Sequence, residues 1–453
     1  MQDEYLMKIE SEFSNCVELI FNFTSRHSVT TFGGVPDIQS DFGQRLFMVA
    51  VHKGFHLAQE KIIDTLLWLE REISEIQERI KESRKQGKGN VKQLQHYKYK
   101  LGYYIKVTKK CADSIAWQMI GQQHYIARRL FIGEPNMPLQ STNLKMGIEF
   151  VKEYNNANPA SFALLSDLTT FIQIGDALIV NGTTGTLKIV ELKEGKVNKD
   201  ILDFLKFYGK SKCDYALHSF IEDNGEKYLQ QMNRIVRQCQ RSQATTKILN
   251  TGQGVEPIDG MNVKISEDYY ELEYFEDVVY NLLKQVNNKN WAIDIIEGCL
   301  FIGAYKGNFP GQQAFKMWTK LEGFSGPIID FRSTFYAPIA VPPFLLPLGE
   351  KTIMDIIFGR KHLVLGLNFD PWLRLARLIG LQTNYYSRKQ TAKMLNDKSQ
   401  FKPYIHKDKA IKFSLNGKEL AMGDGLVGRM LFDLVLPSST HLLIKETLEI
   451  EWK

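Results

Sequence analysis

The chain has 453 residues, of which 44% are hydrophobic and 24% are charged, and its formal net charge is +6. This composition is typical of a globular protein and excludes an intrinsically disordered one. The length exceeds that of one ordinary hydrophobic core, so we expect two or three packed units. No stretch approaches the roughly 18 consecutive apolar residues that a membrane-spanning helix needs, so we expect no membrane partner.

The N-terminus and the cysteines indicate a cytoplasmic protein. The first residues, MQDEYLMKIESEF, are acidic and amphipathic, whereas a secretory signal peptide has a basic start and an apolar run. The five cysteines are scattered without a CxxC pair, which argues against a zinc ribbon and against a disulfide framework. The modest positive charge permits a polyanionic partner without requiring one.

Residues 1–132 are predicted to form a helical domain. Apolar residues recur at helical spacing over residues 52–84 and again from 94 to about 130. The polar segment 85–90 (KQGKGN), which contains two glycines, separates the two stretches. A short polar break between long amphipathic helices predicts an antiparallel helical hairpin.

Basic and aromatic side chains gather around the turn of this hairpin. Between Arg79 and Lys110 there are eleven Lys and Arg residues against one acid, with four tyrosines interleaved. Such a mixture can bind a phosphate backbone and stack on bases. A solvated tip and an oligomerisation arm are the other interpretations. The side chains predicted to contact nucleic acid here are Lys88, Lys92, Lys98 and Lys100.

A linker with two prolines, GEPNMPLQ at 133–140, precedes a mixed segment predicted over residues 141–250. An Asn-Gly turn with a further glycine, NGTTG at 181–185, predicts a β-hairpin within this segment. Residues 255–453 are predicted to be a mixed α+β domain of unknown role, with strands at 292–302 and 361–367. The elements expected in the middle segment are a helix at 143–155, strands at 162–170, 172–181 and 186–193, a helix at 199–208, a strand at 213–221 and a helix at 226–249.

The hairpin brings acidic and basic side chains together. Its turn sets Asp176 opposite Val190 or Glu191, so two carboxylates can lie within roughly 5 Å on neighbouring strands. Glu191 and Lys193 are two residues apart on a strand and therefore share a face. Burying unpaired acids beside apolar strand residues would be costly unless a cation neutralised them. A hard divalent ion, Mg²⁺ or Mn²⁺, is the expected occupant, and it would suit phosphodiester cleavage.

These residues resemble the core motif of the PD-(D/E)XK nuclease superfamily: Asp176, then fourteen residues with a hairpin, then Glu191-Leu192-Lys193. The resemblance covers residues 143–249, where the expected element order matches the superfamily's restriction-endonuclease-like αβββαβ core. It implies that Asp176, Glu191 and the carbonyl of Leu192 hold the metal, and that Lys193 orients water or stabilises charge on the phosphate. Gly175 stands where the superfamily's name-giving proline would be.

The resemblance also implies supporting residues. The superfamily often places a further acid on the helix before the first strand, and Glu153 is the candidate, with Glu149 as the alternative; both could instead be solvent-facing. A helix with Gln and Arg side chains often follows the core, and here they recur on one stripe that suits phosphate, although an ordinary polar surface stripe is the alternative. The side chains of this stripe are Gln231, Arg234, Gln238 and Arg241.

The sequence therefore predicts a Mg²⁺-dependent nuclease acting on nucleic acid, with DNA ahead of RNA. By analogy alone, the mixture of domains resembles bacterial genome-defence or restriction nucleases, which implies a defence-system partner protein or a homo-oligomer. One alternative is a non-catalytic nucleic-acid-binding or scaffold protein that keeps the fold. Another is a structural protein whose helical hairpin mediates oligomerisation, with the acids incidental.

Overall fold

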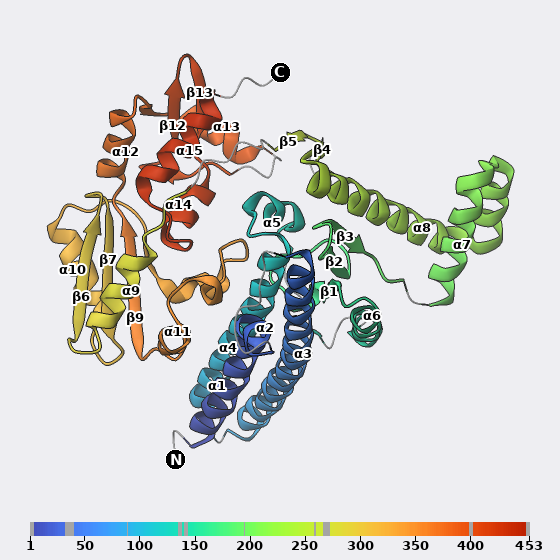
Figure 1. Cartoon of the computed structure of the whole chain (residues 1–453), viewed down its shortest axis with the longest axis horizontal. Helices are drawn as coiled ribbons and strands as arrows, with labels where there is room; N and C mark the ends of the chain where they lie inside the picture. The colour runs from blue at the N-terminus through green and yellow to red at the C-terminus, as the bar shows by residue number, and fades with distance from the viewer. Residues whose placement is uncertain are drawn as a thin grey trace. The chain divides into compact units, whose positions relative to one another are not determined.

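The computed structural model (Figure 1) combines many helices with small antiparallel sheets. It divides into two compact units, residues 1–265 and residues 266–453. Among the helices that the structure describes, none has the length and apolar character needed to cross a membrane. The described residues are 4–31, 40–87, 89–134, 138–139, 144–193, 195–257, 260–265, 272–397 and 402–449.

The first unit contains eight α-helices and five strands within its described residues. Its elements are α1 (Glu4–Ser25), α2 (His27–Thr31), α3 (Asp41–Gln86), α4 (Val91–Met119), α5 (His124–Leu130), α6 (Leu144–Ala157), β1 (Ser161–Leu165), the 3₁₀ helix η2 (Ser166–Leu168), β2 (Ala177–Asn181), β3 (Leu187–Val190), α7 (Lys196–Ser211), α8 (Asp214–Thr251), β4 (Gln253–Val255) and β5 (Asn262–Lys264). In chain order, helices α1 to α6 precede the strands β1 to β3, and helices α7 and α8 follow them.

Helices α3 and α4 form the predicted antiparallel hairpin, and α1 packs against both (Figure 1). The turn forms where the sequence favours it, because Gly87 adopts a left-handed conformation (φ 62°) after α3 and the Asn90 side chain caps the start of α4. The second helix is shorter than predicted. It ends at Met119, and Gly121 and Gln122, both with positive φ, separate it from α5.

A three-stranded antiparallel sheet, in the order β1–β2–β3, follows in the first unit. Strands β2 and β3 are joined by the predicted turn. Amide side chains bind the main chain of both outer strands. Gln59 of α3 and Asn155 of α6 hydrogen-bond to Ala163 of β1, and Asn250 of α8 bonds to both main-chain groups of Leu187 on β3. These bonds satisfy main-chain groups that a further strand would otherwise pair with.

The predicted strand at 213–221 is wrong, because these residues begin helix α8, which is kinked at Gly225 (φ 77°). Leu217, Phe220 and Ile221 pack against α7, and the Phe220 ring stacks on Phe204 with centroids 4.0 Å apart. These side chains are three and four residues apart, which is the spacing of one helix face and not the alternation of a strand. The expected αβββαβ order therefore lacks its last strand in the described residues.

Buried charges connect helix α4 to the loop before β2. Lys110 and Asp113 form an ion pair of 3.0 Å in which both side chains are fully buried. The Asp113 carboxylate also accepts the Thr170 N–H at 2.7 Å. One residue earlier, the Lys109 ammonium donates to the main-chain oxygen of Asp167 at 2.8 Å, and burial lowers the pKa of Lys109. The helical bundle and the sheet thus belong to one packed unit.

The second unit is mixed, as predicted. The predicted strand at 361–367 is β9, whereas the stretch 292–302, predicted as one strand, forms the two strands β6 and β7 with a turn at 297–299 between them. One antiparallel sheet has the order β6–β7–β9–β8, and another joins β10 and β13 to β12. Its elements are α9 (Glu276–Gln285), β6 (Trp291–Ile296), β7 (Leu300–Lys306), α10 (Gly311–Leu321), β8 (Ile328–Asp330), η3 (Phe331–Tyr336), η4 (Pro343–Leu345), α11 (Glu350–Ile357), β9 (Lys361–Leu367), α12 (Phe369–Leu378), β10 (Gln382–Tyr385), α13 (Arg388–Asn396), β11 (Ile405–His406), β12 (Lys409–Leu415), β13 (Lys418–Ala421), α14 (Asp424–Leu431) and α15 (Pro437–Glu449).

Candidate active site

The two predicted acids lie near each other at the end of the β2–β3 hairpin away from its turn, where the Glu191 charge acts on the Asp176 carboxyl. Asp176 directly precedes β2 and Glu191 directly follows β3. Ala177 pairs with Val190, and the Asp176 N–H donates to the Val190 carbonyl at 2.7 Å. Asp176 and Ala177 thus both lie across from Val190, and Glu191 is the next residue along the chain.

The residue before Asp176 must be glycine in this backbone. Gly175 has a φ of 77°, whereas the proline ring fixes φ near −65°. A Cβ atom at this position would also lie 2.3 Å from the Cγ2 atom of Ile189. The departure from the superfamily's proline therefore has a local cause: the chain turns sharply into β2 while passing close to β3.

The Asp176 carboxylate is half-buried and its negative charge is incompletely compensated. Burial raises the pKa of Asp176, and the nearby Glu191 charge raises it further. The Leu192 N–H opposes this shift by donating to Oδ2 of Asp176. A cation placed between the two acids would favour the charged form of Asp176 and so oppose this rise in its pKa.

Lys193 is held between Glu191 and helix α8. Its ammonium donates to Oε2 of Glu191 at 2.8 Å and to Oε1 of Gln238 at 3.0 Å. The Ser242 hydroxyl donates to the other oxygen of Glu191 at 3.2 Å. The Glu191 and Lys193 side chains are only 14% and 13% exposed. Strand β3 ends at Val190, so contact rather than strand alternation brings the predicted pair together.

Helix α8 supplies these contacts because it runs antiparallel to β3. Gln238 meets Lys193, Ser242 meets Glu191 and Asn250 meets Leu187. From Gln238 to Asn250 the helix rises about 18 Å at roughly 1.5 Å per residue, and the extended chain from Leu187 to Lys193 covers about 20 Å. Because these two lengths are similar, the contacts between α8 and residues 187–193 stay aligned along both segments.

The predicted Gln and Arg stripe is divided between internal contacts and solvent. Gln238 binds Lys193, and the Gln231 amide donates to Asn198 of α7 at 2.7 Å. Arg234 is exposed and Arg241 is half-buried. Two of the four side chains therefore hold other side chains of the protein, while contact of Arg234 and Arg241 with phosphate stays a prediction.

The expected further acid on α6 does not contact the site. Glu153 is exposed, and its helix buries Gly147 and Val151, the centre of the predicted apolar face. Among the described residues, neither a hydrogen bond nor an ion pair joins Glu153 to Asp176 or Glu191. Glu149 is also exposed and lies 4.0 Å from Lys145.

A different acid, Asp167, lies near Asp176. The Ser166 N–H donates to the Asp176 carbonyl at 2.9 Å, so the next residue, Asp167, follows directly where β1 ends. The negative charge of Asp167 contributes to the raised pKa of Asp176. This neighbour was missed because the first strand was predicted to continue to residue 170, whereas it ends at Leu165.

The side chains present fit a magnesium ion that is held mainly by water and substrate. Within the described ranges there is no group of three or more His, Cys, Asp and Glu side chains arranged to hold a metal. Magnesium is often bound by only one or two carboxylates, with waters and substrate phosphates completing its octahedron. Asp176 and Glu191 supply two hard oxygen donors of this kind.

The four hairpin lysines have different surroundings. Lys92 and Lys98 are exposed on α4. Lys100 forms an ion pair with Glu10 of α1 at 2.6 Å, so its charge is partly compensated within the protein. Lys88 lies outside the described residues. The exposed pair, Lys92 and Lys98, keeps the predicted role of binding phosphate.

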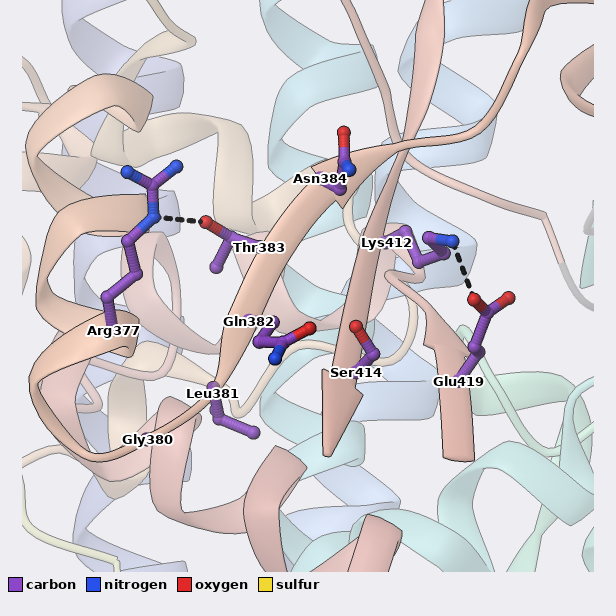
Figure 2. A pocket seen from close by; sticks show the side chains of 9 residues that line it. All are labelled: Arg377, Gly380, Leu381, Gln382, Thr383, Asn384, Lys412, Ser414 and Glu419. Carbon is purple, nitrogen blue, oxygen red and sulfur yellow. Dashed lines mark hydrogen bonds and ion pairs between the residues drawn. The ribbon is translucent and has the colours of Figure 1, made fainter. Parts of the chain in front are cut away.

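A polar pocket of about 460 Å³ in the second unit contains none of the predicted site residues. Figure 2 shows it over strands β10, β12 and β13, with Arg377 reaching in from α12. Its charged groups already have partners: Lys412 lies 2.6 Å from Glu419, and Arg377 donates to Thr383 at 2.9 Å. We therefore assign no ligand to this pocket.

Comparisons with family models, with curated proteins and with solved structures returned no match. The features that bear on function are therefore the geometry around Asp176 and the motif that Asp176, Glu191 and Lys193 form.

Proposed function

We propose that this protein is a Mg²⁺-dependent nuclease that hydrolyses phosphodiester bonds in nucleic acid. The observation that carries the proposal is that Asp176, Glu191 and Lys193 gather at one end of the β2–β3 hairpin, with the Lys193 ammonium 2.8 Å from Glu191. Two acids and a lysine at one end of a small sheet are the groups that metal-assisted hydrolysis of a phosphodiester requires.

Each side chain has a distinct role in this proposal. Asp176 and Glu191, with the carbonyl of Leu192, would hold the ion, which when bound polarises the phosphate and lowers the pKa of a water. Ser242 and Lys193 fix the two oxygens of Glu191, and each oxygen keeps a further lone pair for the ion. Gln238 orients the Lys193 ammonium so that it can stabilise negative charge on the phosphate.

Cleavage assays with the purified full chain test this proposal. The substrates are plasmid, linear duplex DNA, single-stranded DNA and tRNA, each with Mg²⁺, Mn²⁺ or EDTA. We expect cleavage of at least one DNA substrate with metal and none with EDTA. An Asp176→Asn preparation, purified in parallel, controls for contaminating nucleases. Binding without metal-dependent cleavage of any substrate would instead support the alternative of a non-catalytic nucleic-acid-binding protein.

Replacing Lys193 with alanine should reduce the cleavage rate by about a hundredfold, which is the typical effect of removing one electrostatic stabiliser. An ammonium group cannot ligate the ion, so the Mn²⁺ affinity measured by calorimetry should change little. Lys188→Ala is the matched control, because Lys188 is exposed on β3 and should leave the rate unchanged. A Lys193→Ala protein that cleaves at the wild-type rate would show that this lysine is structural.

Neutralising Lys92 and Lys98 with glutamine should weaken nucleic-acid binding without changing the cleavage rate at saturation. The slope of log affinity against log salt should become shallower by up to about 0.9 for each lost duplex contact. Lys389→Gln with Lys393→Gln is the matched control, since both lysines are exposed on α13 and the change in net charge is equal. Identical salt slopes in the two double variants would exclude a phosphate contact at the hairpin.

A further inference from the structure

The edge strand β6 of the second unit exposes an apolar row. Within the described residues β6 pairs with β7 alone. Trp291, Ile293 and Ile295 alternate along β6 and so share one face of the sheet. Their exposed fractions are 48%, 37% and 39%, whereas Ala292 on the opposite face is buried. Large apolar side chains in a continuous row on an edge strand are a typical feature of an interaction surface.

Helix α10 covers the same face but leaves β6 open. Phe315 of α10 packs against Phe301 and Tyr305 of β7, which pair in register with Ile295 and Trp291. The helix contacts β7 and β9 much more than β6. The row on β6 therefore continues the hydrophobic core beneath α10 out to the edge of the sheet.

The exposed flank of α10 extends this apolar surface. Gln312 donates to Asp330 of β8 at 2.8 Å, so that flank of the helix faces the far edge of the sheet. Leu321, which is 86% exposed, lies on the opposite flank, toward β6, and Met317, which is 70% exposed, lies one turn before it on the side of the helix that points away from the sheet. We call the five side chains Trp291, Ile293, Ile295, Met317 and Leu321 the β6–α10 surface.

The main chain of β6 is also oriented for pairing. The Lys306 N–H donates to the Asn290 carbonyl at 3.0 Å, so Asn290 faces β7 in the ladder. In an antiparallel ladder alternate residues bond to alternate sides, so the main-chain groups of Trp291, Ile293 and Ile295 point away from β7. The Ile295 N–H donates to the Asp294 side chain at 2.8 Å, and a pairing strand would replace that bond.

We propose that β6 pairs antiparallel with β6 of a second copy of this chain, with the two-fold axis beside Ile293. This register exchanges main-chain hydrogen bonds between the two Ile293 residues. It sets Trp291 opposite Ile295 of the partner subunit. An aromatic residue opposite a β-branched one is a favourable cross-strand pair. Strand β6 is thus complementary to itself in its exposed apolar row.

The same pairing covers the rest of the surface. A two-fold axis perpendicular to the sheet keeps both α10 helices on one face of the joined sheet. With strands about 4.8 Å apart, the two β7 strands lie about 14 Å from each other. The row on β6 from each copy fills the space between the helices, and Leu321 of each copy borders this space. Standard interfaces bury about 1,600 Å² in total, and a smaller one implies a concentration-dependent dimer.

Light scattering and sedimentation of the full chain over a concentration series test this proposal. Both are measured in EDTA without nucleic acid, so the result does not depend on the nuclease proposal. We expect the mass to rise with concentration to twice the 52.2 kDa of one chain. Ile293→Lys places two like charges opposite each other at the axis, so we expect the dimer dissociation constant to increase about tenfold or more.

Two further variants keep the test decisive. Leu321→Lys alters a side chain that is 86% exposed, so it weakens the dimer without threatening the fold and decides the matter if Ile293→Lys does not fold. Leu378→Lys is the matched control, because Leu378 is 82% exposed on α12, outside the β6–α10 surface. A single-chain mass at every concentration would overturn the proposal. So would a dimer with the same dissociation constant in all three variants.

Discussion

Replacing Asp176 with asparagine should abolish metal-dependent cleavage, with a loss of about a thousandfold or more. The asparagine side chain still has an oxygen that can accept the hydrogen bond from the Leu192 N–H. It lacks the negative charge that holds the ion. Metal-assisted charge stabilisation is worth several kcal/mol, and each 1.4 kcal/mol or so is tenfold in rate. Initial rates at saturating Mg²⁺ measure the effect. Glu191→Ala should have a similar effect on the rate, and full cleavage by both variants would refute the active site.

The same asparagine variant should be at least as stable as the wild type in metal-free buffer near neutral pH. The raised pKa of Asp176 means that its charged form is disfavoured in the folded protein. Below about pH 3.9, the ordinary pKa, the Asp176 carboxyl is protonated in both the folded and the unfolded protein and does not destabilise the fold. As the pH rises through the higher pKa of the folded state, the free energy of unfolding falls. The advantage of Asp176→Asn should therefore shrink as the pH is lowered toward about 4, as thermal melts in EDTA would show.

The expected gain in stability applies to the Asp176 variant and not to a Glu191 variant. Glu191 holds the Lys193 ammonium and the Ser242 hydroxyl, so Glu191→Ala should not share the gain in stability. Asp203→Asn, at an exposed position on α7, is the control for a lost carboxylate. An Asp176→Asn protein that melts well below the wild type at neutral pH would show that the Asp176 carboxylate is compensated within the protein and needs no cation.

Replacing Asp113 with alanine should lower the free energy of unfolding by about 3–5 kcal/mol, the usual cost of breaking a buried ion pair. The change leaves the fully buried Lys110 ammonium without the carboxylate 3.0 Å away. It also removes the acceptor of the Thr170 N–H. Chemical denaturation monitored by far-UV circular dichroism measures the loss.

A double variant tests the cause of that loss. Lys110→Met with Asp113→Ala removes both charges without enlarging either side chain, so it should recover part of the stability that Asp113→Ala loses, because no buried charge is left without its partner. The Thr170 N–H would still lack its acceptor, so full recovery is not expected. A loss below about 1 kcal/mol for Asp113→Ala would show that Lys110 is solvated or otherwise compensated.

Local sequence signals predicted the elements whose formation depends on neighbouring residues. The Asn-Gly turn at 181–185 predicted the hairpin and narrowed its register to two choices. The strands take the register that pairs Ala177 with Val190, and the Asp176 N–H also donates to the Val190 carbonyl. The glycines and Asn90 predicted the turn between α3 and α4. By contrast, Leu217, Phe220 and Ile221 suit a strand by composition, and their helical spacing extends over too few residues to be distinctive.

Contacts between distant segments could not be predicted in the same way. The polarity of Gln238 suggested a phosphate ligand, but only the path of α8 along β3 shows that it binds Lys193. Lys110 and Asp113 look like ordinary members of a charged helix in the sequence, and their burial becomes visible only when α4 packs against the loop at Thr170. The position of Asp167 beside Asp176 depends on where β1 ends, and element ends are weakly encoded.

Helix α3 spans the distance from the three-stranded sheet to the turn of the helical hairpin. Gln59, near its middle, binds β1 of the sheet that carries Asp176, and its last residues reach the hairpin turn at Gly87. At about 1.5 Å per residue these points are about 40 Å apart, a distance that matches roughly 12 base pairs at 3.4 Å each. Lys92 and Lys98 lie back from this turn along α4, about 26 and 17 Å from Lys109, whose ammonium bonds to Asp167 near the acids. A duplex of roughly 5 to 8 base pairs therefore matches the distance from these lysines to the site, and the full length of the hairpin suits a longer one.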